Sequence, residues 1–112
     1  MDLETLYSSL NNVLEGKVFY GTNIYDNGDN ASMPYIVYQE VSKRPIGYSD
    51  DKPIYRRINV QITLVTKNKD LSLEKKLEKA LTDNNINYSM INESHNSDKS
   101  INRVYEINLE EF

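Results

Sequence analysis

The chain has 112 residues, with 13 basic and 17 acidic side chains, one histidine and no cysteine, so its formal net charge is −4. The lack of cysteine excludes thiol catalysis, disulfides and thiolate metal sites, and a lone histidine excludes most metalloenzyme centres. Proteins that bind DNA without sequence preference usually carry the opposite net charge, whereas this length suits one domain, which we expect over residues 1–112.

The N-terminal part of the sequence predicts a helix, a short strand and a longer strand. Leucines at steps of three and four predict a helix over residues 2–15, with Asp2 as its cap and Gly16 as its stop. A strand at Lys17–Tyr20 and a polar loop at Gly21–Ser32 follow. Tyr35–Ser42 is apolar on both faces, which is typical of a strand with a neighbour on each side.

The next stretch predicts a loop and then the most regular strand of the chain. Pro45, Gly47 and Pro53 predict a loop over residues 43–53, because prolines and glycines interrupt regular strand pairing. From Ile54 to Thr66, apolar and polar side chains alternate as in a strand with one buried face. Arg56 interrupts the inward set, so we expect the first part of this strand to project beyond the core.

The C-terminal part predicts a second helix and two more strands. The helix runs from a cap at Asp70 or Ser72 to about Asp83, with an apolar stripe of leucines and alanine. Its charged side chains, which we expect to face water, are Glu74, Lys75, Lys76, Glu78 and Lys79. Strands follow at Ile86–Ser94 and Ile101–Glu110. The order α-β-β-β-α-β-β predicts an α+β fold, an antiparallel or mixed sheet of about five strands with two helices packed on it.

Few side chains in the sequence are placed to carry catalysis. His95, Ser97 and Asp98 are neighbours in a polar turn, with no nucleophile elbow or oxyanion device beside them. Asp26–Asn30 resembles a calcium loop only faintly, because the glycine and glutamate that the motif needs are missing at their places. The scattered glycines form no phosphate-binding loop. We therefore expect no enzymatic activity, no cofactor and no metal site.

Candidate interface residues gather in and beside the segment 43–53. Ile46 and Tyr48 are large side chains in a polar loop, so they are candidates to anchor a partner or to fold back over the sheet. The basic pairs favour salt bridges or subunit contacts over nucleic acid, and strand alternation should send Arg56 and Arg57 to opposite faces. The adjacent acids are more typical of a solvated loop than of catalytic carboxylates. The candidate set is Arg44, Ile46, Tyr48, Asp50, Asp51, Arg56 and Arg57.

A layout running from Pro34 to Leu81 carries a resemblance. It consists of the run Pro34–Tyr38, a polar end to that strand, the alternating strand Ile58–Leu64, and Lys67–Asp70 leading into an amphipathic helix. This layout resembles the tail terminator, or head–tail joining, proteins of long-tailed bacteriophages and prophages. The opening helix, the strand Val18–Tyr20 and the closing strands fit the same pattern, so the resemblance extends over nearly the whole chain.

The resemblance implies a structural virion protein with no catalytic residues. Its copies are expected to form a ring, a hexamer in this family, that caps the tail tube, stops its growth and joins it to the head connector. The implied partners are other copies of the chain, the major tail-tube protein and the connector or stopper protein. DNA would only pass through the lumen, a task that suits an acidic protein because a cationic lining would bind phosphates. The implied location is the head–tail junction of the virion, and the host cytoplasm during assembly.

Other functions stay open at the level of sequence. The same kind of module could serve elsewhere in the head–tail connector, as a stopper or minor capsid protein. A small host binding or regulatory module with a similar layout is a further alternative. An enzyme is the weakest alternative, because no constellation of residues supports it. The sequence has no apolar run long enough to cross a membrane and no targeting segment that we can recognise, so we expect no membrane partner.

Overall fold

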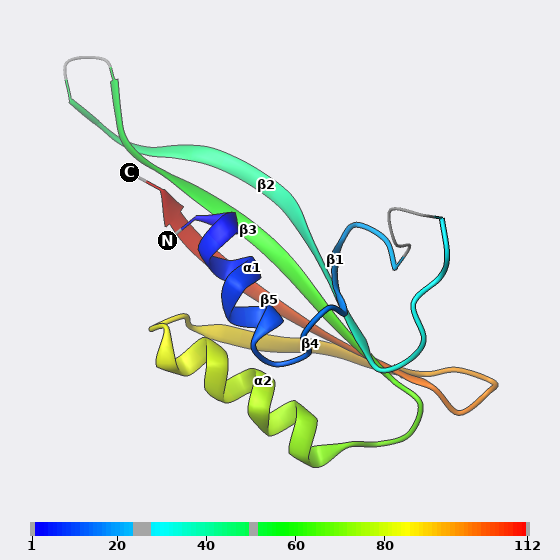
Figure 1. Ribbon diagram of the computed structural model, residues 1–112. Coiled ribbons are helices and arrows are strands. Elements are labelled where there is room, and N and C mark those ends of the chain that lie inside the picture. The colour runs from blue at the N-terminus through cyan, green and yellow to red at the C-terminus, as the bar shows by residue number, and fades with distance from the viewer. Residues whose placement is uncertain (1, 24–27, 50–51, 112) are drawn as a thin grey trace.

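The computed structural model describes residues 2–23, 28–49 and 52–111, and its helices and strands follow the predicted order (Figure 1). Five strands form one sheet in the order β1-β2-β3-β5-β4. β1 pairs with β2 in parallel, and the other neighbouring strands pair antiparallel, so the sheet is mixed and the α+β fold is confirmed. The elements are α1 (Leu3–Asn11), β1 (Val18–Tyr20), β2 (Tyr35–Ser49), β3 (Lys52–Thr66), α2 (Leu71–Asp83), β4 (Tyr88–His95) and β5 (Ile101–Glu111).

Both helices begin at aspartate caps. The Asp2 carboxylate accepts a hydrogen bond from the Thr5 amide at 2.9 Å, and Asp70 accepts one from the Leu73 amide at 3.0 Å. These bonds satisfy backbone donors that a helix start would otherwise leave open. α1 is shorter than expected, because its last turn tightens: the Val13 amide bonds to the carbonyl of Leu10 rather than continuing the α-helical pattern.

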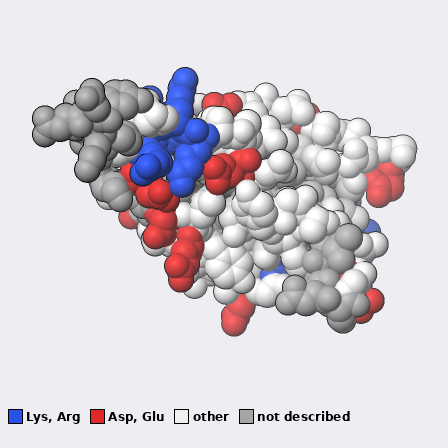
Figure 2. Space-filling model, turned by 90° about the horizontal axis from the view of Figure 1, so that it is seen from above, with Lys and Arg blue, Asp and Glu red and all other residues white. Residues whose placement is uncertain are grey.

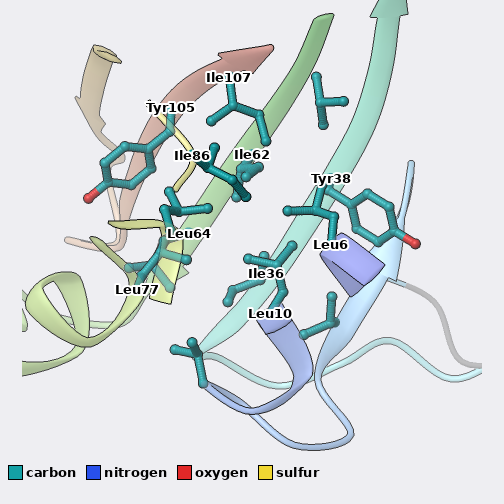
Figure 3. Close-up of a cluster of buried hydrophobic side chains, with 14 of the residues drawn as sticks. Leu6, Leu10, Ile36, Tyr38, Ile62, Leu64, Leu77, Ile86, Tyr105 and Ile107 are labelled. Carbon is teal, nitrogen blue, oxygen red and sulfur yellow. The ribbon is translucent and has the colours of Figure 1, made fainter. Parts of the chain in front are cut away.

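The hydrophobic core lies between the two helices and one face of the sheet. Both helices lie on the same side of the sheet in Figure 1. From Ile58 onward, alternate side chains of β3 are buried in this layer, as the sequence predicts, and the close-up shows Ile62 and Leu64 among labelled side chains of both helices (Figure 3). The side chains of this core with no more than 1% exposure are Leu6, Leu10, Ile36, Ile58, Val60, Ile62, Leu64, Leu77, Leu81, Tyr105 and Ile107.

The other face of the sheet is covered by none of the described helices, and we call it the open face (Figure 1). Its side chains are the alternate set of each strand, and they are mostly polar. Along β3 this set includes Arg57, Asn59 and Gln61, and along β5 it includes Glu106 and Asn108. A sheet with one apolar and one polar face is typical of a two-layer α/β sandwich.

The prediction of a loop over residues 43–53 was wrong. β2 continues to Ser49 and β3 begins at Lys52, and the two strands pair antiparallel through this segment. The ladder joins Arg44 to Arg57, Ile46 to Tyr55 and Tyr48 to Pro53. β5 ends opposite Arg56, so the paired strands beyond it form a hairpin that projects past the end of the sheet (Figure 1).

The two prolines fit this hairpin because of where its edges lie. β1 pairs only with Ile36–Tyr38 of β2, so Pro45 has no described strand on its outer side. Pro53 likewise lies beyond the part of β3 that pairs with β5. A proline without a ladder partner on one side is tolerated in an edge strand. Gly47 has a φ of 69°, a conformation that glycine adopts without strain.

Candidate functional site

Four cations gather where the projecting hairpin leaves the sheet. We call Lys43, Arg44, Arg56 and Arg57 the hairpin base, and Figure 2 shows the basic side chains in this place beside several acids. The antiparallel register sets Arg44 directly opposite Arg57 on the open face. Lys43 and Arg56 point to the helix side, opposite Ile58 and Pro45. Each basic pair of the sequence is therefore split between the faces, and the open face receives one arginine from each pair.

The ion pairs of the hairpin base are exposed. Lys43 Nζ lies 3.1 Å from Glu111 Oε1, and Arg57 lies 3.9 Å from Glu110, with each side chain at least one third exposed. Exposed pairs of this kind contribute little to stability. Like charges directly across a strand pair are unfavourable, so the Arg44–Arg57 contact does not stabilise the hairpin either. These cations are consequently better placed to meet another surface than to hold the fold.

A shallow hollow on the open face adjoins the arginines. It is lined by Ser42, Arg44, Arg57, Asn59, Glu106 and Asn108. The Asn59 side-chain amide donates to Glu106 Oε1 at 3.1 Å and to Asn108 Oδ1 at 3.2 Å. The hollow thus offers guanidinium donors, a hydroxyl, amides and a carboxylate, and these groups can bind a polar surface of another protein. Within residues 2–23, 28–49 and 52–111, no group of three or more His, Asp or Glu is placed to hold a metal ion.

The predicted interface residues are brought together only in part. Ile46 follows Arg44 on the open-face side of β2 and is partly buried, opposite Tyr55. Arg56 lies on the other face. Asp50 and Asp51 lie outside the described residues, as does the side chain of Tyr48. The structure therefore groups Arg44, Ile46 and Arg57 on one surface.

A charged cluster under α2 was missed at the level of sequence. Glu74 was expected to face water, but it is only 5% exposed, and Glu78 is partly buried. Arg103 reaches both: its Nε lies 3.5 Å from Glu74, and its Nη2 lies 3.4 Å from Glu78. Because an arginine on the facing strand supplies the counter-charge, these two carboxylates turn inward instead of outward.

Two tyrosines, a third glutamate and a lysine complete this cluster. The Tyr105 hydroxyl donates to Glu78 at 2.7 Å, and the Tyr88 hydroxyl donates to the same carboxylate at 3.0 Å. Glu93 accepts from Lys69 at 2.7 Å and from Arg103 at 3.0 Å. The Lys69 bond, helped by Arg103, lowers the pKa of Glu93 to about 2. We call this cluster the clamp, because it fastens α2 to β4 and β5.

The position of Arg103 was the signal that could have revealed the clamp. Arg103 falls on the inward set of β5, between Ile101 and Tyr105, both of which are buried. Glu74 and Glu78 are one helical turn apart, at the edge of the apolar stripe of α2. An arginine on an inward strand position predicts buried carboxylates nearby, which the apolar pattern alone does not reveal.

The sequence motifs set aside as non-catalytic lie apart from the hairpin base. The exposed His95 has its Nε2 3.3 Å from Glu93 Oε2, rather than pairing with Asp98. Asp98 accepts hydrogen bonds from the amide and hydroxyl of Ser100, which stabilise the turn between β4 and β5. Residues 26 and 27 of the faint calcium-loop pattern lie outside the described residues.

Comparison with known proteins returned no relative: neither the scan against protein-family models nor the search of curated proteins produced a match. Among the described residues, the helices are too short and too polar to span a lipid bilayer.

Proposed function

We propose that this protein is a tail terminator of a long-tailed bacteriophage or prophage, a virion protein that works as a ring of identical copies. In this proposal the ring caps the tail tube, stops its growth and joins it to the head connector. It is expected to be a hexamer, with DNA passing through its lumen. The work is geometric, since it consists of copies and partners docking on one another, and it needs no catalytic group.

The observation that carries the proposal is the projecting β2–β3 hairpin with its cationic base. The molecule is elongated, 54 Å long against 31 and 24 Å in the other directions, and the hairpin forms one end of it (Figure 1). A subunit of a joining ring needs lateral surfaces for its own copies and a projection for the neighbouring ring. The two faces of the sandwich offer the lateral surfaces, and the hairpin offers the projection.

The charge of the chain supports the same proposal. Each copy carries a net charge of −4, so a ring of copies is acidic overall. Tight binding to DNA comes from the neutralisation of phosphates by cations, and an acidic conduit avoids it. The cations of the hairpin base would then lie at protein contacts and not along the lumen. Tight binding of purified protein to duplex DNA at physiological salt would contradict this part of the proposal.

Deletion of the gene in its phage tests the proposal. We expect DNA-filled heads and separate tails of abnormal length in electron micrographs of the lysate, because tube growth is not stopped and heads have nothing to join. The wild-type gene supplied in trans should restore joined virions, which controls for effects on neighbouring genes. Normal joined virions from a clean deletion would reject the proposal.

The same phage distinguishes a terminator from a stopper. A terminator leaves with tails that are purified from a mutant unable to make heads, whereas a stopper stays on filled heads from a mutant unable to make tails. Detection of this protein on both preparations with an antibody decides between them. Its presence on heads alone would assign it to the stopper role.

A further inference from the structure

The open face carries charges of opposite sign on its two halves. Arg44 lies on β2, in the half of the sheet nearer β1, and Arg57 lies on the central strand β3, within 3.9 Å of Glu110. Glu106 and Glu110 lie on β5, toward the other half, and both are exposed. The hollow between Arg44 and Glu106 joins the two halves. A surface that docks here must therefore be acidic over one half and basic over the other.

The helix layer, on the other surface of the molecule, carries charges of the opposite sign on each half. Residues 2–16, which include α1, contain three acids and no lysine or arginine, and the carboxylates of Glu4 and Glu15 are exposed. On α2, the exposed outer face carries Lys75, Lys76 and Lys79. α1 with its flanking residues is thus the acidic half of the layer, and the outer face of α2 is mainly basic, although Lys79 also pairs with the exposed Asp83 at 2.6 Å.

The two helices lie over opposite halves of the sheet. α1 lies over β2, where the rings of Tyr7 and Tyr38 have centroids 6.3 Å apart. α2 lies over β4 and β5, where Glu78 accepts the hydroxyls of Tyr88 and Tyr105. The acidic helix therefore lies on the same side of the molecule as the open-face arginines, and the basic helix lies on the same side as the open-face glutamates, on opposite surfaces of the sandwich.

We propose that a second copy of this chain docks its helix layer on the open face, with its α1 over Arg44 and Arg57 and its α2 over the glutamates of β5. Stacking copies in one orientation brings opposite charges together on both halves at once. The contact joins two different surfaces, so each copy keeps one of each free for the next. This inference rests on the proposed function and names the surfaces by which the ring would be built.

A face-to-face dimer through two open faces is the main competing arrangement. It also sets arginines near glutamates, but it is closed after two copies and leaves α1 and α2 outside the contact. A ring needs the head-to-tail arrangement instead. The two arrangements differ in whether charges on α1 matter, and this difference can be measured.

Reciprocal charge reversal tests the inference. One variant, Arg44→Glu with Arg57→Glu, reverses the arginines of the open face, and the other, Glu4→Lys with Glu15→Lys, which we call the α1 variant, reverses the exposed glutamates of α1 and of the turn after it. We expect each variant alone to associate at least about 100-fold more weakly than the wild type, since like charges would then meet across the contact. An equimolar mixture should recover wild-type association, because each variant complements the other. The readout is sedimentation velocity at low salt, with circular dichroism to verify folding.

The control variant is Lys67→Glu with Lys99→Glu, which makes the same change in net charge as the arginine variant, at exposed positions outside both surfaces. It should associate as the wild type does. Loss of association in the arginine variant but not in the α1 variant would establish a face-to-face contact and overturn the inference. A wild-type protein that stays monomeric at low salt, or a mixture that fails to recover, would overturn it as well.

A DNA arm separates this contact from nucleic-acid binding. Fluorescence anisotropy with a short DNA duplex should give no difference between the wild type and the arginine variant. Duplex binding that is lost in this variant, with self-association unchanged, would assign the arginines to DNA instead. The gene deletion tests the terminator role and does not depend on this contact. Joined virions from a deletion would therefore reject the terminator role. The head-to-tail contact would still be tested by the mixture of the two variants.

Discussion

Two arginine clusters at opposite places in the sandwich differ in where their counter-charges come from. In the clamp, Arg103 is 17% exposed at its side chain and bonds to Tyr105 and to the carboxylates of Glu93 and Glu78. At the hairpin base, Arg44 faces Arg57, and the ion pairs nearby are exposed. The clamp finds its partners within the chain and holds the fold. At the hairpin base the ion pairs among the described residues are exposed to solvent, which suits a contact with another molecule.

The largest effect on stability is expected when a charged side chain is placed in the hydrophobic core. Ile62 is fully buried on the helix side of β3, so Ile62→Asp should unfold the protein, since burying an unpaired charge costs several kcal/mol. The neighbouring Gln61→Asp, on the open face opposite Glu106, is the matched control and should cost only about 1 kcal/mol, because it adds a like charge to the ladder at an exposed position. Urea denaturation followed by circular dichroism measures both. A folded Ile62→Asp protein would contradict the assignment of the two faces.

Removal of the clamp arginine should come next in size. Arg103→Leu leaves the partly buried Glu78 without its cation and removes one of the two cations at the buried Glu74, which keeps Lys69 at 3.0 Å, so we expect a cost of up to about 3–5 kcal/mol. Arg44→Leu at the hairpin base should cost less than about 0.5 kcal/mol. Chemical denaturation of both variants makes the comparison directly. Equal losses of stability in the two variants would show that the clamp and the hairpin base contribute equally to the fold.

Acid should weaken the clamp in a defined range of pH. The pKa of Glu93 is lowered from 4.5 to about 2 in the folded protein, mainly by the hydrogen bond from Lys69. Its contribution is therefore complete above pH 4.5 and is lost as the pH falls toward 2. Stability measured across this range should fall less steeply in Glu93→Gln and in Lys69→Gln than in the wild type. An unchanged slope in both variants would contradict the role of this pair.

The smallest effect on stability is expected at the hairpin. Ile46→Ser with Tyr48→Ser should leave the fold and the melting temperature essentially unchanged, because Ile46 lies in the projecting part of the sheet. Assembly of the protein, followed by sedimentation velocity or by complementation of the deletion phage, should weaken. Assembly at the wild-type level would show that these two side chains do not anchor a partner and only cover the sheet.

The sequence predicts the element order and most of the core because hydrophobic spacing is a local signal. The alternation from Ile58 to Leu64 is such a signal, and the cap at Asp2 is an equally local one, whereas the sequence left the cap of the second helix open between Asp70 and Ser72. The pairing across Pro45 and Pro53 was missed, since proline rules depend on which strand edges are free, and that is set by the ladder with β1 and β5.

The clamp and the regrouped arginines were missed for a related reason. Arg44 and Arg57 become neighbours only through the antiparallel register, and Arg103 meets Glu74 and Glu78 only after α2 has docked on the sheet. Each of these contacts joins residues far apart in the sequence, where periodicity carries no information. Candidate interface residues could be proposed from composition, but their grouping on one face required the fold.

Growth of tail tubes in the presence of this protein tests the terminator proposal most directly. Purified tail-tube protein from the same phage is assembled into tubes with and without the purified chain, and the lengths and ends of the tubes are recorded by electron microscopy. The proposal expects a ring on one end of each tube and no further elongation from that end. Tubes that keep growing from both ends, with no ring attached, would contradict it.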